Sequence, residues 1–295
     1  YFYPYDFRNS AKELVQNHLT FFIFQHTALW QENKWPRAIS VNGFVNVEAD
    51  KMSKSRGNII PLSDAIKNYG ADMVRINIAI ANEGMDDADW RIENMKGIRM
   101  RLDYLYNLSK DTRKCRRAGQ ESIDTYLLSR LQKTTKAATE NYETTKFRTA
   151  AQYALFESTN EIKWYITRCG GIKNANAKTL KEALSIVVRM LAPLTPHICE
   201  EMWSMLGNKG FVSVARFPEY DAKKEDAGIE QAEEFVKQIL GDIREIQKLL
   251  TKKPKKISVF IAPDWKFDIY KFVLKNKAMS MNETIKSLMA TDAKR

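Results

Sequence analysis

Cysteine, histidine and long apolar runs are all scarce in this sequence of 295 residues. The cysteines Cys115, Cys169 and Cys199 are scattered, odd in number and without a C-x-x-C pair. This pattern indicates reduced thiols in a cytosolic protein and argues against a disulfide framework or a zinc site. The three histidines are too dispersed to suggest a metal centre. No apolar run reaches the roughly 18 residues of a membrane span, and no signal peptide is recognisable. We therefore expect no protein-bound metal, no membrane partner and a cytoplasmic location.

The rest of the composition is that of an ordinary globular protein, with 44% hydrophobic and 28% charged residues. The length allows two or three domains with a sizeable core. The formal net charge is +11, and this excess of lysine and arginine favours an anionic partner such as nucleic acid.

One short stretch concentrates phosphate-binding chemistry, Lys51-Met52-Ser53-Lys54-Ser55-Arg56-Gly57-Asn58. A strand-like run ends before it at Val47, and a helix-like run follows it from Leu62. Lysine is a compact point charge on a flexible stem, so both ammonium groups can follow phosphate oxygens as their geometry changes. The hydroxyls and free backbone N–H groups add donors, and Gly57 lets the backbone bend. A K-x-x-K pair alone is typical of a solvated basic loop, but the full octapeptide between strand and helix favours a polyphosphate site.

The octapeptide resembles the KMSKS signature of class I aminoacyl-tRNA synthetases, of which KMSKSRGN is a frequent form. In that family the loop closes over ATP, and its second lysine stabilises the charge that develops as the amino acid attacks the α-phosphate. The resemblance implies this catalytic role for Lys54, with Lys51 assisting. It also implies an ATP-binding set, with ATP and Mg²⁺ as the substrate complex: Lys51, Met52, Ser53, Lys54 and Ser55.

Residues 1–61 have the pattern of the second half of a Rossmann-type α/β domain. We expect three elements there: an aromatic strand or extended entry over 1–6, a helix over 14–30 with Asn9 or Ser10 as its N-cap, and a strand over 39–47 interrupted by Gly43. Such a strand–helix–strand unit predicts a parallel pair with a right-handed crossover. Ligands of these sheets bind at the carboxyl ends of the strands, which is where the lysine loop follows.

The segment Tyr3-Pro4-Tyr5-Asp6-Phe7-Arg8-Asn9-Ser10-Ala11-Lys12-Glu13-Leu14, followed by Asn17-His18-Leu19, resembles the leucyl-tRNA synthetases, especially the archaeal and eukaryotic kind. In related enzymes a Gly-x-Asp/Glu element here places an acidic side chain on the ATP ribose. The resemblance implies that role for Glu13, with Ala11 replacing the glycine; a first-turn residue favoured by the helix dipole is the alternative. Gly43 marks either close approach of the backbone to a ligand such as adenine or a simple bulge.

Residues 62–95 form the expected connector between two domains. A short helix from Leu62 ends at Gly70, an apolar helix covers 71–81, and an acidic run extends from Asn82 to Trp90. The string Tyr69-Gly70-Ala71-Asp72-x-x-Arg75, together with the acidic run, again resembles leucyl-tRNA synthetases. Isoleucyl, valyl and methionyl relatives share its Gly-Ala-Asp-x-x-Arg part. In the family this connector braces the catalytic domain and touches the inner corner of tRNA.

Residues 96–218 predict a helical bundle, because apolar residues recur at helical spacing, and the string from Leu191 to Trp203 resembles the end of the anticodon-binding domain in this synthetase subclass. The expected helices follow 96–117, 122–142, 146–168 and a final pair over 179–206 that Pro193 and Pro196 break, with Thr195 as N-cap. The first of these stretches carries eight Lys or Arg against two Asp, a local charge of +6. A solvated basic face is one interpretation, and phosphate contact, which the family context favours, is the other. The residues expected to bind tRNA are Lys96, Arg99, Arg101, Arg113, Lys114, Arg116 and Arg117.

Residues 219–295 predict a small basic α+β appendage that is incomplete as an archaeal-type C-terminal domain. It should contain a linker over 219–227, an amphipathic helix over 235–250, a strand over 257–261 and a helix over 265–274.

These patterns together predict a mainly α chain that supplies the KMSKS loop and tRNA-binding domains of a leucine–tRNA ligase. Its expected partners are ATP, leucine and tRNA(Leu), and a separate N-terminal synthetase half is a further candidate. The His-x-Gly-His tetrapeptide of the first class I signature is absent from these residues. We therefore expect a C-terminal part that is inactive by itself. An isoleucyl, valyl or methionyl relative and a non-catalytic tRNA-binding module are the alternatives.

Overall fold

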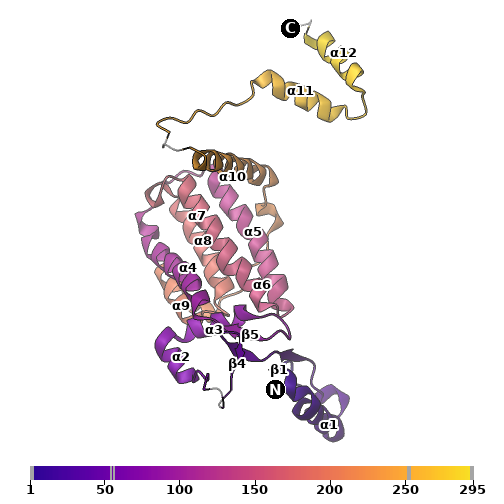
Figure 1. Ribbon diagram of the computed structural model, residues 1–295, viewed down its shortest axis with the longest axis vertical. Helices are drawn as coiled ribbons and strands as arrows, with labels where there is room; N and C mark the ends of the chain where they lie inside the picture. The colour runs from indigo at the N-terminus through magenta and orange to yellow at the C-terminus, as the bar shows by residue number, and fades with distance from the viewer. Residues whose placement is uncertain (1–2, 54, 56, 251–253, 293–295) are drawn as a thin grey trace. The chain divides into compact units, whose positions relative to one another are not determined.

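A computed structural model describes residues 3–53, 55, 57–250 and 254–292. The chain divides into two compact units, Tyr1–Phe235 and Val236–Arg295. In the first unit the structure has an α/β part, two connecting helices and a bundle of long helices (Figure 1). Helices predominate, as the sequence predicts.

The α/β part begins with two parallel strands, β1 (Arg8–Ala11) and β2 (Ile39–Asn42), paired from Arg8 opposite Ile39 to Ala11 opposite Asn42. The predicted parallel pair is confirmed. The first strand was placed wrongly, because it lies at 8–11 and not at 1–6. Asn9 and Ser10, the predicted N-caps, belong to this strand, since pairing with β2 outweighs their local capping preference.

The helix between these strands also starts later than the sequence predicts. A 3₁₀ turn, Lys12–Leu14, and a π-helical turn, Val15–Leu19, precede helix α1 (Thr20–Leu29).

The predicted strand over 39–47 divides at Gly43 and Phe44 into two strands that serve different sheets. After the break, β3 (Val45–Val47) joins a three-stranded sheet in the order β4-β3-β5. Strand β4 (Asp50–Lys51) is antiparallel to β3, and β5 (Ala88–Trp90) is parallel to it. The lysine loop therefore leaves from the edge strand of a small mixed sheet.

The connector contains helices α2 (Leu62–Tyr69) and α3 (Ala71–Ala81), both within a residue of the predicted bounds. Gly70 separates them with a φ of 87°, a left-handed conformation that glycine adopts without strain. Helix α3 is buried at Met73, Val74 and Ile76, which explains its crowded apolar sequence.

The bundle contains α4 (Ile92–Asp111), α5 (Ser122–Glu143), α6 (Phe147–Ala151), α7 (Ser158–Arg168), α8 (Ala177–Leu191) and α9 (Pro196–Met205). A π-helical segment, Gln152–Glu157, joins α6 to α7, so the predicted helix over 146–168 is confirmed with a local widening. Helix α5 packs against α6, α7 and α8 (Figure 1). The fully buried side chains of the core include Leu105, Tyr126, Leu131, Leu155, Ile162, Tyr165, Leu184 and Met190.

The proline break between α8 and α9 lies where the sequence predicts it. Pro196 is the first residue of α9, and Thr195 occupies the N-cap position. The Thr195 hydroxyl nevertheless donates back to the Leu191 carbonyl at 3.3 Å and does not cap α9. At α8 the cap is Asn176, whose side chain accepts from the backbone N–H groups of Lys178 and Thr179.

The last three helices are α10 (Ala227–Lys248), α11 (Asp264–Lys275) and α12 (Met281–Asp292). Helix α10 starts eight residues before the predicted position, and α12 has no counterpart in the prediction. The strand predicted over 257–261 is wrong: these residues are neither helix nor strand, and Phe260 and Ile261 are exposed. A β-rich sequence needs a partner strand, and the structure gives this segment none among the described residues.

Candidate nucleotide site and basic bundle surface

The carboxyl ends of β1 and β2 bring chemistry-bearing residues to one edge. Lys12 follows the last residue of β1, and Gly43 and Phe44 follow the last residue of β2. Because the two strands are parallel and in register, these residues lie close together. Lys51, the last residue of β4, reaches the same place.

Two ammonium groups surround the ring of Phe44. The Lys51 Nζ lies 4.0 Å from the ring centroid, and the Lys12 Nζ lies 4.8 Å from it. Cations attract the face of an aromatic ring, so Phe44 holds both lysines near the end of β2. Lys12 is a candidate site residue that the sequence reasoning missed. Its position after a strand could have indicated it, but the strand was placed at 1–6.

Asp87 supplies the counter-charge of this lysine pair. Its carboxylate accepts from Lys12 Nζ at 2.5 Å and from the Phe44 backbone N–H at 2.8 Å. The hydrogen bond from Lys12 is the main reason that the pKa of Asp87 lies below its usual range; the Phe44 N–H and the charge of Lys51 act in the same direction. The cluster of Lys12, Phe44, Lys51 and Asp87 is therefore a charged site at the strand ends.

Gly43 lies against the chain's own backbone. A Cβ atom there would lie 2.1 Å from the Asp86 carbonyl oxygen and 2.7 Å from Asp87 Oδ1. Close approach of β2 to the acidic run therefore requires glycine at this position, whether or not a ligand binds. A cavity of about 250 Å³ also borders Gly43, between the strand ends and the last turn of α3. An adenine contact by Gly43 stays a prediction.

The signature loop is held closed by its last residue. The Asn58 side chain accepts from the Ser53 backbone N–H at 2.9 Å and donates to the Lys51 carbonyl at 3.2 Å. The hydroxyl oxygens of Ser53 and Ser55 lie 2.9 Å apart. Asn58 thus links the two ends of the loop by hydrogen bonds, a role that the sequence reasoning did not assign. Lys54, the predicted catalytic lysine, lies outside the described residues.

Two other predicted ATP-binding residues, Met52 and Glu13, lie in the same region. The backbone N–H of Met52 donates to the Val45 carbonyl at 3.4 Å, which extends the β3–β4 hairpin toward the loop. Glu13 is exposed in the 3₁₀ turn after β1. Its ribose contact stays a prediction.

The acidic run joins this site to the helical bundle. Asp89 accepts from the Ala49 backbone N–H at 2.9 Å and from Arg91 Nε at 2.6 Å, and these donors lower its pKa despite partial burial. Glu83 accepts from the Thr149 hydroxyl of α6 at 2.8 Å. The acids of the connector therefore fix its backbone and are not a pair of catalytic carboxylates.

The acidic residue Asp72 links the start of α3 to the start of α9. It accepts from the Ile198 backbone N–H at 2.8 Å, and its other oxygen lies 2.8 Å from His197 Nδ1. The carboxylate lies in the first turn of α3 and at the first turn of α9, where helix dipoles favour a negative charge.

The bundle residues predicted to bind tRNA divide into surface and interior groups. Lys96, Arg99, Arg113, Lys114 and Arg116 are exposed. Arg101 packs over Phe156, with its guanidinium carbon 4.6 Å from the ring centroid, and donates to the Gly97 carbonyl.

Arg117 is an internal residue. Its side chain is 14% exposed and forms two hydrogen bonds to the buried carboxylate of Asp124, at 2.6 and 2.9 Å. It also donates to the Asn174 carbonyl at 2.7 Å. Both edges of its guanidinium are occupied by the protein, which disfavours a direct contact with RNA, and the tRNA-binding role of Arg117 stays a prediction. The sequence could not show this, since Asn174 is distant along the chain.

Arg113, Lys114 and Arg116 belong to a basic surface built from two segments. The turn Thr112–Lys114 and the residues after it lie beside the turn Ile172–Asn174, where the Arg116 backbone N–H donates to the Lys173 carbonyl at 2.9 Å. We call Arg113, Lys114, Arg116 and Lys173 the basic end of the bundle. Lys173 is a member that the sequence reasoning missed, because only the fold brings it there.

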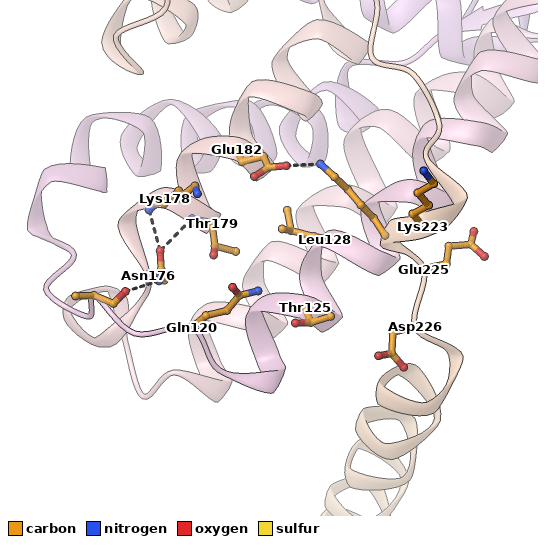
Figure 2. A pocket seen from close by; sticks show the side chains of 12 residues that line it. Gln120, Thr125, Leu128, Asn176, Lys178, Thr179, Glu182, Lys223, Glu225 and Asp226 are labelled. Carbon is orange, nitrogen blue, oxygen red and sulfur yellow. Dashed lines mark hydrogen bonds and ion pairs between the residues drawn. The ribbon is translucent and has the colours of Figure 1, made fainter.

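A polar cavity of about 520 Å³ lies near this end, between the starts of α5 and α8 and the segment before α10 (Figure 2). Several of its polar groups form hydrogen bonds or ion pairs within the chain. Asn176 caps α8, and Glu182 pairs with Lys224 at 2.7 Å. Figure 2 shows Gln120, Thr125 and Lys178 around the same opening.

Within the part of the chain that the structure describes, no three His, Cys, Asp or Glu side chains are placed to hold a metal ion. No described helix is long and apolar enough to cross a membrane.

Comparison with known proteins agrees with this geometry. Residues 124–261 match the family described as anticodon-binding domain of tRNA ligase, and residues 9–100 match tRNA synthetases class I (M). A solved structure with a TM-score of 0.64 is the leucyl-tRNA synthetase of Agrobacterium radiobacter K84 in a ternary complex with tRNA and LeuAMS. It is 20% identical, and the alignment covers 88% of this chain and 36% of that chain, so it supports the fold alone. The first part of the chain is therefore similar to class I tRNA synthetases, and the helical bundle is similar to the anticodon-binding domain of tRNA ligases.

Among tRNA synthetases, the curated relatives of the chain are leucine–tRNA ligases. The chain is 41% identical over 290 residues to the leucine–tRNA ligase of Methanococcoides burtonii, covering 96% of this chain and 29% of that enzyme. It is 39% identical over 292 residues to that of Methanocaldococcus jannaschii, covering 98% of this chain and 30% of the enzyme. The chain is similar to these leucine–tRNA ligases over nearly all of its own length and spans about 30% of theirs.

Proposed function

We propose that this chain supplies the KMSKS loop and tRNA-binding surfaces of a leucine–tRNA ligase, which activates leucine with ATP and transfers it to tRNA(Leu). The observation that carries the proposal is the signature loop, held by Asn58 and placed beside the carboxyl ends of two parallel strands. The likeness to curated leucine–tRNA ligases supports leucine over the other amino acids. The domain layout proposed with it is 1–61 catalytic, 62–95 connector, 96–218 bundle and 219–295 appendage, in the cytoplasm.

The proposed catalysis is electrostatic. The triphosphate of the ATP–Mg²⁺ complex would meet Lys51 at the end of β4, with Lys54 three residues along the same loop. As leucine attacks the α-phosphate, negative charge develops on the pyrophosphate leaving group, and positioned ammonium groups stabilise it more in the transition state than in the bound substrate. Asp87 would hold Lys12 at the strand ends before ATP arrives, through the hydrogen bond from Lys12 Nζ.

Substitution of the loop lysines tests this role. In the enzyme that contains this segment, Lys54→Ala should lower leucine-dependent ATP–pyrophosphate exchange by about 10²- to 10³-fold, since removal of one preorganised donor has costs of that order. Lys51→Ala should have a smaller effect. Binding of tRNA, measured by filter retention, should remain nearly unchanged in both.

Lys67→Ala is the matched control, because Lys67 is an exposed lysine on α2. An unaltered exchange rate in Lys54→Ala would contradict the proposed role of that lysine. Exchange that depends on isoleucine, valine or methionine and not on leucine would contradict the proposed substrate.

A further inference from the structure

The residues proposed to bind ATP come from two small sheets. The turn after β1, in the two-stranded sheet, carries Glu13, the proposed ribose contact. Strand β4, in the three-stranded sheet, ends at Lys51 and leads into the signature loop. A nucleotide at this edge would contact both sheets, so its affinity would depend on how firmly one sheet is held against the other.

The chain connection between the sheets is short and closely packed. Two residues, Gly43 and Phe44, separate β2 from β3. A Cβ atom at Gly43 would lie 2.1 Å from the Asp86 carbonyl oxygen, and the Phe44 carbonyl accepts from the Ala88 backbone N–H at 2.8 Å. The segment that leads into β5 therefore lies directly against this junction.

Asp87 connects three segments at the junction. One of its oxygens, Oδ1, accepts from the Phe44 backbone N–H at 2.8 Å and from Lys12 Nζ at 2.5 Å. Lys12 directly follows β1 in the first sheet, and Asp87 directly precedes β5 in the second. The ion pair is therefore a side-chain link between the two sheets, in addition to the chain connection.

The ring of Phe44 adds to this link. Lys12 Nζ lies 4.8 Å from the ring centroid and Lys51 Nζ lies 4.0 Å from it, so one ammonium group from each sheet contacts the same ring. The two ammonium groups repel each other, and the carboxylate of Asp87 offsets that repulsion. The side chains of Lys12 and Asp87 are 35% and 36% exposed, so solvent weakens their ion pair without removing it.

We propose that Lys12 and Asp87 are positioning residues of the ATP site. Their ion pair holds the turn that carries Glu13 against the junction that leads to the signature loop, so both sheets present a preformed surface to the nucleotide. Preorganisation of this kind lowers the cost of binding, so the affinity for ATP depends on the pair more than the chemical step does. The inference rests on the proposed function, because it takes ATP as the ligand.

The test measures leucine-dependent ATP–pyrophosphate exchange in the enzyme that contains this segment, with ATP varied at saturating leucine. Asp87→Asn removes the charge but keeps an oxygen that can accept from the Phe44 N–H. It should raise the KM for ATP about two- to fivefold, as expected for a partly exposed ion pair, and change kcat by less than about twofold. Lys12→Met should do the same. Lys12→Arg, which keeps the charge, should restore most of the affinity.

The double variant Lys12→Met with Asp87→Asn separates positioning from direct contact with ATP. Two residues that act as one pair should give the double variant the same KM as either single variant. A second readout is independent of activity. The Val15 backbone N–H donates to the Lys12 carbonyl within the turn, and its hydrogen exchange should be faster in both single variants.

Asp6→Asn is the matched control. Asp6 pairs with Arg37 at 2.8 Å, just before the amino ends of β1 and β2 and therefore at the opposite edge of the same sheet. This substitution removes an equal charge from an equal kind of pair. It should change neither the KM for ATP nor hydrogen exchange at the Val15 amide.

Three outcomes would overturn the proposal. The first is an unaltered KM for ATP in both single variants. The second is a pair of effects that multiply in the double variant, which would assign Lys12 to direct contact with ATP. The third is unaltered hydrogen exchange at Val15. Absence of leucine-dependent exchange in the unsubstituted enzyme would contradict the proposed function instead, and exchange at Val15 would still test the link between the sheets.

Discussion

Single residues carry unusual backbone geometry beside the lysine loop. The β3–β4 hairpin turns through Glu48 and Ala49, with φ values of 49° and 70°. Two-residue hairpin turns of this type need left-handed residues at both positions and usually contain asparagine or glycine. Asp89 offsets the strain by accepting from the Ala49 N–H, and the Glu48 N–H donates to the Trp90 carbonyl. The acidic run thus holds the turn that presents Lys51.

We expect Ala49→Gly to stabilise this hairpin. Glycine removes a left-handed strain of about 1–2 kcal/mol and costs about 0.5–1 kcal/mol in chain entropy. The net gain of about 0 to 1.5 kcal/mol should slow hydrogen exchange at the Met52 amide by up to about tenfold. Ala232→Gly, at an exposed position inside α10, should have the opposite effect on the amides around it. Faster exchange at Met52 in Ala49→Gly would show that the turn is unstrained.

At the scale of elements, a buried charge network holds the starts of α5 and α8 and the last turn of α7 together. Asp124, at the beginning of α5, accepts from Arg117, from the Glu121 backbone N–H at 2.7 Å and from the Tyr165 hydroxyl of α7 at 2.7 Å. Tyr165 in turn accepts from the backbone N–H of Asn176, the cap of α8. Every oxygen and guanidinium edge in this network therefore has a partner, as buried charges require.

This network makes the bundle sensitive to acid. Burial alone would raise the pKa of Asp124, but Arg117, the Glu121 N–H and Tyr165 outweigh it, and the pKa lies below its usual range. A carboxyl whose pKa is depressed by folding contributes stability that is complete above its unfolded pKa, about 4, and is lost as pH falls through the lower folded value. The urea midpoint of the chain should therefore fall as pH decreases below about 4.

Asp124→Asn should lower the urea midpoint at pH 7 and flatten its decline below pH 4, because the titrating group is gone. Asp103→Asn is the control, because the Asp103 carboxylate is exposed on α4. Its ion pair with Arg99 is long, at 3.6 Å, and both side chains are open to solvent. Equal acid profiles for the unsubstituted chain and Asp124→Asn would assign the acid sensitivity to other carboxyls, such as Glu230, whose pKa is also lowered.

At the scale of the whole molecule, part of the net charge of +11 is concentrated at the basic end of the bundle. Arg113, Arg116 and Lys173 converge there from two turns that the fold brings side by side. A polyanion bound at this end would release one condensed counterion for nearly every phosphate that it contributes, so affinity should fall with salt.

We expect the chain to bind tRNA with an association constant that depends on salt. The logarithm of this constant should fall linearly with the logarithm of the salt concentration. The double variant Arg113→Gln with Arg116→Gln should reduce the magnitude of that slope by between about 1 and 2. Lys146→Gln with Arg148→Gln removes the same charge near the opposite end of α5, about 30 Å away along a helix of 22 residues. An equal effect of both double variants would indicate diffuse attraction and no defined basic end.

Local chemistry by itself determined several features of this protein. The octapeptide at 51–58, the glycine between α2 and α3, and Pro196 at the start of α9 all act through backbone geometry or charge within a few residues. The helices of the bundle follow from apolar spacing, because each buries one continuous stripe. The resemblance to leucyl-tRNA synthetases was also readable at this level, since the motifs that carry it are contiguous.

Only the tertiary structure decided the features that depend on distant partners. Lys12 joins Lys51 because β1 pairs with β2 in register, and Arg117 turns inward because Asp124 and Asn174 meet it there. Residues 257–261 have a strand-like sequence but no strand, because a strand exists only by pairing. Propensity is set by each residue alone, whereas pairing and burial are set by neighbours that the sequence does not place.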